Sequence, residues 1–326
     1  MAPLRRRRVQ LVSLTRVLLS DDFGVRWSLP PGALCPAVPN RVRCLCVVRR
    51  LLRPVPGPVC GLDIGTGASC IYPLLGRAMF GWRFVAADAD PSAVDAALRN
   101  VRLNSGFEAA IRVVRVSGDT ALTDALRAAH ETEPAVHFCI CNPPFFDRSE
   151  RPDDTFGDAP AADDAEAAAE PDRKRPRKRT AARDCEQFTA GGEVAFVEHM
   201  IRESAVFGRD VGWYVVMIGK KASLTPLFAT LRDSGADVRR GEVALGRTVR
   251  WLLAWSFAER SAAAQAPTAS DTAVAFPLHI PLPRGATLPA VWRRLRQIAG
   301  AHSAIRTADQ SGALRLTCTL HLRSCG

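Results

Sequence analysis

Four consecutive residues, Asn142-Pro143-Pro144-Phe145, combine side-chain types that suit chemistry on a planar amine. Two successive prolines stiffen the backbone and remove N–H donors that would otherwise engage nearby carbonyls. The Asn142 side-chain oxygen and the Pro143 carbonyl could then accept both protons of an NH₂ group, while the Phe145 ring stacks on a flat base or amide. Acceptors that draw those protons out of plane free the nitrogen lone pair for attack on a methyl sulfonium held in line. The alternative is an ordinary Asn-Pro turn with a buried phenylalanine.

A second segment, Leu62-Asp63-Ile64-Gly65-Thr66-Gly67, reads as a strand that ends in a glycine turn. Glycines at this point let the backbone approach a nucleoside, and the following helix offers free N–H groups. Asp88 lies 23 residues after Gly65, at the end of the next expected strand. A carboxylate there can accept hydrogen bonds from both ribose hydroxyls. The two features together predict a nucleoside site, and the absence of a P-loop lysine argues against a triphosphate.

The elements that must position these motifs alternate short apolar runs with helical patterns from about residue 59. This alternation predicts an α/β fold with a doubly wound, mostly parallel sheet. Strands are expected at 59–64, 82–88, 111–116, 136–141, 212–219, 237–245 and 250–257, and helices at 70–80, 91–104, 119–129, 193–207 and 224–233. Seven strands that end in a strand pair follow the plan of the Rossmann-like class I methyltransferases, whose last strand is antiparallel. Both motifs then face the ligand-binding edge of the sheet.

The composition divides the chain into parts. Eight acids between 153 and 172 precede six basic residues between 173 and 179, a composition that cannot bury enough apolar surface to order itself. The expected division is 1–58 as an N-terminal segment that completes the fold, 59–258 as the methyltransferase domain with a disordered charged insertion at 147–189, 259–272 as a linker, and 273–326 as a small α+β module. In the last part, a helix is expected at 288–299 between two strands.

The charge and cysteine content narrow the function classes. The net charge of +11 suits a polyanionic partner, although only four of the 44 basic residues are Lys, so an Arg bias from a GC-rich genome is the alternative. No apolar run reaches the ~18–20 residues of a membrane span. Ten cysteines without a CxxC pair, and six histidines without ligand spacing, predict free thiols in a reducing compartment and no metal site.

From about Leu11 to Phe257, the chain resembles the methyltransferase-like protein 16 family of adenine-N6 RNA methyltransferases. That family modifies U6 small nuclear RNA and is related to bacterial enzymes that methylate an adenine of 23S ribosomal RNA. The resemblance is carried by LDIGTGASCIYPLLG, CNPPFF, GGEVAFV, WYVVMIGKKASL and GRTVRWLLAWSF, in that order. It implies S-adenosylmethionine as the cofactor and N6-methyladenosine in a structured RNA, such as U6 small nuclear RNA, as the product. It also implies that the chain from Leu14 onward belongs to the fold and is not a presequence.

The resemblance assigns roles to single residues. Catalysis would rest on Asn142, Pro143, Pro144 and Phe145. Arg41 matches an arginine that reaches the methionine carboxylate of the cofactor, Gly65, Asp88 and Asn142 match further cofactor contacts, and Thr120 matches a threonine near the adenine. The alternatives are a surface charge for Arg41 and a helix cap for Thr120.

Contacts with RNA phosphates are expected from Lys220, Lys221, Arg247 and Arg250, with a solvated face as the alternative for each. The chain departs from the family pattern in four places, one of which is the charged insertion, which is longer than expected. Arg5–Arg8 stand where a longer basic module is usual, and Asp119 replaces a lysine before Thr120. A tail of about 54 residues replaces the large C-terminal RNA-binding region of vertebrate members.

Rival interpretations stay open. Loops of the NPP-aromatic type also resemble those of guanine-N2 methyltransferases and of enzymes that methylate a release-factor glutamine. A ribosomal RNA substrate is a further rival, and so is an RNA-binding protein with vestigial catalysis. The run at 173–179 is a nuclear import signal, an RNA clamp or a charged loop. We expect a nuclear location with a cytoplasmic fraction.

Overall fold

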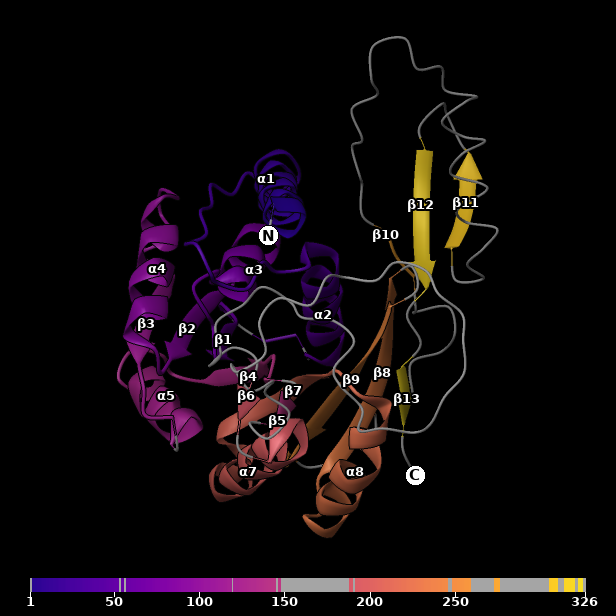
Figure 1. Ribbon diagram of the computed structural model, residues 1–326. Helices are drawn as coiled ribbons and strands as arrows, with labels where there is room; N and C mark the ends of the chain where they lie inside the picture. Colours follow the sequence, from indigo (N-terminus) through magenta and orange to yellow (C-terminus); the bar gives the residue numbers. More distant parts are fainter. Residues whose placement is uncertain are drawn as a thin grey trace, which may run out of the picture.

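A central sheet with helices on both of its faces forms the body of the molecule (Figure 1). The computed structural model describes residues 2–52, 54–55, 57–118, 120–144, 146–147, 188–189, 191–245, 248–258, 273–275, 305–309, 314–319 and 322–324. Within these ranges, no helix is both long enough and apolar enough to cross a membrane.

The sheet has the strand order β3-β2-β1-β4-β7-β9-β8, extended at the β8 edge by β13. These strands are β1 (Cys60–Ile64), β2 (Arg83–Asp88), β3 (Ile111–Arg115), β4 (Val136–Cys141), β7 (Val211–Ile218), β8 (Asp237–Leu245), β9 (Thr248–Ser256) and β13 (Leu322–Ser324). Strands β1 to β4 and β7 are parallel, whereas β9 runs antiparallel to both β7 and β8. This arrangement confirms the predicted class I methyltransferase fold, and β13 adds an antiparallel edge strand that the sequence did not predict.

Seven helices of the described chain flank the sheet. They are α1 (Ala2–Phe23), α2 (Val38–Leu51), α3 (Ile71–Phe80), α4 (Pro91–Arg102), α5 (Ala121–His130), α7 (Gly192–Phe207) and α8 (Leu224–Asp233). The side chains of α1 to α4 pack into one hydrophobic cluster and those of α5, α7 and α8 into another, on the opposite face (Figure 1). The five helices from α3 to α8 begin and end within two residues of the predicted ranges. Helices α1 and α2 were not predicted.

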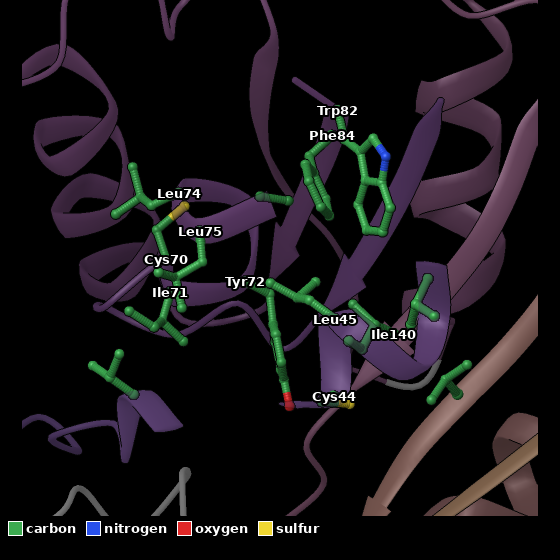
Figure 2. Close-up of a cluster of buried hydrophobic side chains, with 14 of the residues drawn as sticks. Cys44, Leu45, Cys70, Ile71, Tyr72, Leu74, Leu75, Trp82, Phe84 and Ile140 are labelled. Carbon is green, nitrogen blue, oxygen red and sulfur yellow. The ribbon is translucent and has the colours of Figure 1, made fainter. Parts of the chain in front are cut away.

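The alternation of side chains along β4 feeds both clusters. Phe138 and Ile140 belong to the cluster under α2 and α3, while Cys139 and Cys141 belong to the cluster under α5 and α7, as the two-residue period of a strand requires. The Phe138 ring lies so close to Gly61 of β1 that an added Cβ would be 2.2 Å from it. Gly61 is therefore required by packing. Figure 2 shows the first cluster, with the Trp82, Phe84 and Tyr72 rings among aliphatic side chains.

Two buried asparagines, Asn100 in α4 and Asn104 just after its end, hold the extended segment that follows α1. The Asn100 side chain accepts from the Ser28 N–H at 2.8 Å and donates to the Ser28 and Ala68 carbonyls at 2.9 and 3.0 Å. One helical turn later, Asn104 accepts from the Arg26 N–H at 2.8 Å and donates to the Arg26 carbonyl at 2.9 Å. The amide side chains thus pair with alternate residues of the segment as a neighbouring strand would. The N-terminal segment is fixed to the helix that follows β2.

Short elements complete the described structure. They are β5 (Phe146–Asp147), β6 (Phe188–Thr189), β10 (Ala273–Ala275), β11 (Ile305–Asp309), β12 (Leu314–Thr319), and the 3₁₀ helices η2 (Gly208–Asp210) and η3 (Lys221–Ser223). Strands β5 and β6 pair in parallel, so the two ends of the charged insertion meet. Strands β10, β12 and β11 form a separate antiparallel sheet. The interior of the insertion, the 259–272 linker and the helix predicted at 288–299 lie outside the described residues.

Candidate active site

Four loops converge at one edge of the sheet. Strands β1, β2, β4 and β7 are neighbours and run parallel, so their carboxyl ends meet there. Gly65, Asp88, Asn142 and Gly219 lie at those ends. The two motifs, 77 residues apart from Gly65 to Asn142, are therefore adjacent in space. This edge is where open α/β sheets bind ligands.

The glycine turn after β1 is locked to the end of β2. Gly65 and Gly67 have φ angles of +73° and +63°, in the left-handed region that favours glycine. The Gly67 N–H donates to Asp88 Oδ2 at 2.8 Å, and the Asp90 N–H donates to Asp88 Oδ1 at 2.9 Å. Burial raises the pKa of Asp88, although these two N–H groups oppose the shift. Each carboxylate oxygen keeps lone-pair capacity for a hydroxyl group of a ligand.

Arg41 reaches the site from the buried face of α2. It shares that face with Cys44, Leu45 and Val48, at the i, i+3, i+4 and i+7 spacing of a core-facing stripe. The Arg41 residue is only 7% exposed, so the surface-charge alternative is wrong. An arginine on an otherwise apolar helix face is the signal in the sequence that marks it.

The Arg41 guanidinium joins four elements. Its Nη1 donates to Asn142 Oδ1 at 2.9 Å, to the Tyr72 hydroxyl at 3.2 Å and to Met217 Sδ at 2.9 Å. Its carbon also lies 5.2 Å from the centroid of the Tyr72 ring. The Tyr72 hydroxyl in turn extends toward Cys44 (Figure 2). Sequence reasoning did not single out Tyr72 or Met217, because each lies in an apolar run that reads as core.

Asp63 is a second charged residue in the core beside the site. It lies in β1, whose five residues are all buried, and is 1% exposed. Burial raises its pKa to about 7, while the nearby Thr66 hydroxyl and the Arg41 guanidinium act in the opposite direction. Its Oδ2 atom has no hydrogen-bond partner among the described residues. Sequence reasoning gave Asp63 no role, although a lone acid in an otherwise apolar strand is a signal that could have found it.

The Arg41 guanidinium and the Asp63 carboxylate together fit a ligand that carries both a carboxylate and an ammonium group. The partners of Arg41 described above are three neutral atoms, and its Nε is buried without a partner in the described part of the chain. A carboxylate would satisfy this cation, and the Asp63 oxygen would satisfy an ammonium. The methionine end of S-adenosylmethionine carries these two groups, and Asp88 lies where its ribose would be held.

The Asn142 loop is placed as the sequence predicted, and one member lies outside the described residues. Asn142 and Pro144 are half-buried and Pro143 is buried at the end of β4. Phe145 is not among the described residues. Since an amide oxygen has two lone pairs, Asn142 Oδ1 can accept from Arg41 and from a substrate amine.

Thr120 precedes α5 and lies at the surface. It occupies the N-cap position, yet its hydroxyl donates to Asp124 Oδ2 at 3.0 Å and accepts no helix N–H. The nearby residues Gly118 and Ala121 line a cavity of about 230 Å³, together with Ile64 of β1 and several residues of α7. The segment around Thr120 therefore borders a cavity between α5 and α7.

The basic residues predicted to contact RNA lie at two strand ends. Lys220 and Lys221 are exposed directly after β7, and Arg250 is half-buried near the start of β9. Burial lowers the pKa of Arg250, Glu193 raises it, and Arg41 lowers it further, which places these charges near one another. Arg247 lies outside the described residues.

In the described part of the chain, no three His, Cys, Asp or Glu side chains are grouped to hold a metal ion. The seven cysteines described there are free, and all but Cys35 are buried. Burial raises the pKa of Cys44, Cys46 and Cys60 to about 12, so these thiols stay protonated at neutral pH.

The raised pKa of Asp63 predicts a pH-dependent stability. Its folded pKa of about 7 lies above the ordinary value of 3.8, so the unfolding free energy that Asp63 contributes is fully present below about pH 4 and falls as pH rises to about 7. We expect Asp63→Asn to remove this fall, which is up to roughly 4 kcal/mol. Urea unfolding of both proteins across this pH range measures it. Parallel stability curves for the two proteins would contradict the prediction.

Comparisons with known proteins agree with this geometry. A family model described as RNA methyltransferase matches residues 8–259. The U6 small nuclear RNA (adenine-(43)-N(6))-methyltransferase of Caenorhabditis elegans is 35% identical over 304 residues, which cover 91% of this chain and 60% of that protein. The ribosomal RNA large subunit methyltransferase F of Cronobacter sakazakii is 35% identical over 260 residues, which cover 75% of this chain and 78% of that protein. The chain spans about half the length of the animal relatives it matches.

Solved structures show the same fold. The human METTL16 catalytic domain in complex with a MAT2A 3′UTR hairpin superposes with a TM-score of 0.62 at 37% identity, covering 77% of this chain and 80% of that one. The N-terminal domain of human METTL16 in complex with SAH gives a TM-score of 0.58 at 35% identity, covering 76% and 82%. The matched family model, the strand order and the shared sequence lead to one conclusion: the chain belongs to the METTL16 family of RNA methyltransferases.

Proposed function

We propose that this chain is an S-adenosylmethionine-dependent methyltransferase that forms N6-methyladenosine in a structured RNA, with U6 small nuclear RNA as its substrate. The observation that carries the proposal is the 2.9 Å hydrogen bond between the buried Arg41 and Asn142. It joins the residue suited to a ligand carboxylate with the residue suited to a target amine, beside the turn that suits a nucleoside. Methyl transfer to a planar nitrogen needs these three features together.

Each residue has a distinct task in this reaction. Arg41 binds the methionine carboxylate, Asp63 accepts from the ammonium group, and Asp88 accepts from the ribose hydroxyls. Asn142 Oδ1 and the Pro143 carbonyl accept the two N–H protons of the adenine amine, which aligns its lone pair with the methyl group. S-adenosylmethionine supplies an electrophilic methyl group. The nitrogen forms the new N–C bond as the C–S bond breaks toward sulfur, and one amine proton leaves to solvent.

The shared guanidinium links the two binding events. Arg41 Nη1 contacts Asn142 Oδ1 and would also face the cofactor carboxylate. A carboxylate on Arg41 neutralises the charge that the asparagine oxygen otherwise faces, which makes that oxygen a better acceptor for the amine. Cofactor binding therefore prepares Asn142 for the adenine.

The choice of RNA and the cellular location rest on the relatives and on charge. The nematode relative is named for U6 small nuclear RNA, and the human domain was solved with RNA hairpins. A net charge of +11 favours binding to phosphates. We also propose a nuclear location with a cytoplasmic fraction, supported by the basic run at 173–179. Imaging of a tagged chain that lacks this run tests it, and unchanged nuclear accumulation would contradict an import role.

A ribosomal RNA substrate is the second candidate. The matched region makes up 78% of the bacterial relative that is named for the large-subunit ribosomal RNA. This share is larger than in the animal relatives. Methyl transfer to purified ribosomal RNA, compared with U6 small nuclear RNA, separates the two substrates.

Replacement of Asn142 should stop the reaction without preventing RNA binding. We expect Asn142→Ala to lower the rate of methyl transfer at least about 100-fold, since it removes an acceptor that acts on the reacting amine. RNA affinity should stay within a few-fold. Tritiated methyl transfer to U6 small nuclear RNA, with chromatographic identification of the labelled nucleoside, measures this. Equal turnover by the variant would exclude the amine-holding role, and no labelling by wild type would contradict the proposed function itself.

Replacement of Arg41 should weaken cofactor binding. Arg41→Ala is expected to lower the affinity for S-adenosylhomocysteine by about ten-fold or more, because a charge-assisted contact is lost in a buried site. Isothermal titration calorimetry measures it. Arg43→Ala removes the same charge from the same helix at a half-buried position and serves as the control. The assigned role is wrong if both variants bind the ligand alike.

A further inference from the structure

Glu193 is a buried carboxylate that the reaction described above does not use. It is 3% exposed and lies in the first turn of α7. Gly191 and Gly192, which precede it, have φ angles of +73° and +65°. An added Cβ on Gly191 would be 2.5 Å from the Ala195 Cβ, so the chain turns tightly here. This turn directs the Glu193 side chain from α7 toward the end of β7.

The carboxylate holds the backbone that follows β7. Glu193 Oε1 accepts from the Gly219 N–H, and Oε2 accepts from the Lys220 N–H at 3.2 Å. Burial raises the pKa of Glu193, while these N–H groups, the Ser223 hydroxyl and the Lys220 charge favour its ionised form. Two N–H donors on one carboxylate fix the direction in which the chain leaves the strand. The Lys220 side chain therefore starts from a fixed backbone.

Basic side chains of the described chain surround this anchor, and we call Lys220, Lys221 and Arg250 the cationic rim. Ile218 pairs with Trp251, so the preceding Arg250 lies beside the residue that follows Ile218 in the chain. Arg250 is half-buried and close enough to Glu193 and to Arg41 for both to act on its pKa. The cationic rim thus lies on the same edge of the sheet as Asn142, next to the strand that carries it.

We propose that Glu193 is a positioning residue for RNA, which holds the cationic rim where it meets a phosphate near the target adenine. The inference rests on the proposed function, because it assumes that Asn142 receives a base of an RNA. Lysine has a flexible four-carbon stem, so the place its ammonium can occupy depends on where its backbone is held. A carboxylate by itself repels RNA. Glu193 favours RNA binding here through its hydrogen bonds to the backbone and through its negative charge beside Arg250.

Charge removal at two positions of α7 separates positioning from simple electrostatics. Glu193→Gln and Glu198→Gln remove the same charge, and Glu198 contacts only the Thr230 hydroxyl of α8, at 3.5 Å, among the hydrogen bonds described. Electrostatics alone predicts equal or tighter RNA binding for both variants. We expect Glu193→Gln to weaken binding about three- to ten-fold, Glu193→Ala to weaken it further, and Glu198→Gln to leave it equal or tighter. The probe is a fluorescein-labelled U6 small nuclear RNA stem-loop, measured by anisotropy without cofactor.

Two further readouts distinguish positioning from general loss of structure. The slope of log Kd against log salt concentration should fall by about one in Glu193→Ala, as for the loss of one phosphate contact. In the Glu193 variants, the KM for RNA should rise, while kcat and the KM for S-adenosylmethionine stay within two-fold of the wild-type values. In a Lys220→Ala background, Glu193→Gln should weaken binding less than two-fold. An unchanged salt slope, or full additivity of the two substitutions, would overturn the proposal.

A measurement on the wild-type protein covers the case in which the Glu193 variants do not fold. Amide hydrogen exchange at Gly219 and Lys220 should be slow, since the carboxylate engages both N–H groups. Exchange at the rate of an unprotected loop would overturn the proposal. Because the binding assays contain no cofactor, they can fail while methyl transfer succeeds, or succeed while methyl transfer fails, so the inference and the proposed function are tested separately.

Discussion

The buried guanidinium of Arg41 is the constraint on which the site depends. A cation removed from water must be compensated, and here a phenol oxygen, an amide oxygen and a thioether sulfur share its Nη1. None of the three carries a charge. Asp63, the carboxylate nearby, is itself held partly protonated by burial at neutral pH. The neutral atoms around Arg41 thus compensate its positive charge only in part, and an anionic group would complete the compensation.

The architecture explains how one side chain reaches so many partners. Helix α2 packs against α3 and the β7 side of the sheet, so an arginine on its buried face lies above the carboxyl ends of β4 and β7. The parallel strands bring the ends of β1 and β2 to the same edge. The glycine turn, Asp88 and the Asn142 loop thus lie at one edge of the sheet, with Arg41 on the α2 side. On the α7 side, Glu193 holds the backbone after β7 by hydrogen bonds, just as Arg41 holds the Asn142 side chain.

Much of this arrangement follows from local sequence. The glycine turn, the acid after the second strand and the NPP loop each follow a short apolar run, and the alternation of runs and helices predicts the sheet that joins them. Helices α1 and α2 escaped prediction because arginines interrupt their apolar positions. Asp63, Tyr72 and Met217 escaped because their roles arise only where three elements meet. Strand β13 is three residues long, which is too short for an alternation of apolar and polar residues to identify it as a strand.

The asparagine pair Asn100 and Asn104 has a consequence for the order of assembly. Residues 26 and 28 find their hydrogen-bond partners 78 and 72 residues further along the chain. On the ribosome, the segment after α1 is synthesised long before Asn100 and Asn104 leave the exit tunnel. Until then, the Arg26 and Ser28 backbone groups that these asparagines engage have water as their partner, because the contacts join residues far apart in the chain. The segment after α1 can therefore make these hydrogen bonds only after α4 and the turn behind it have been synthesised.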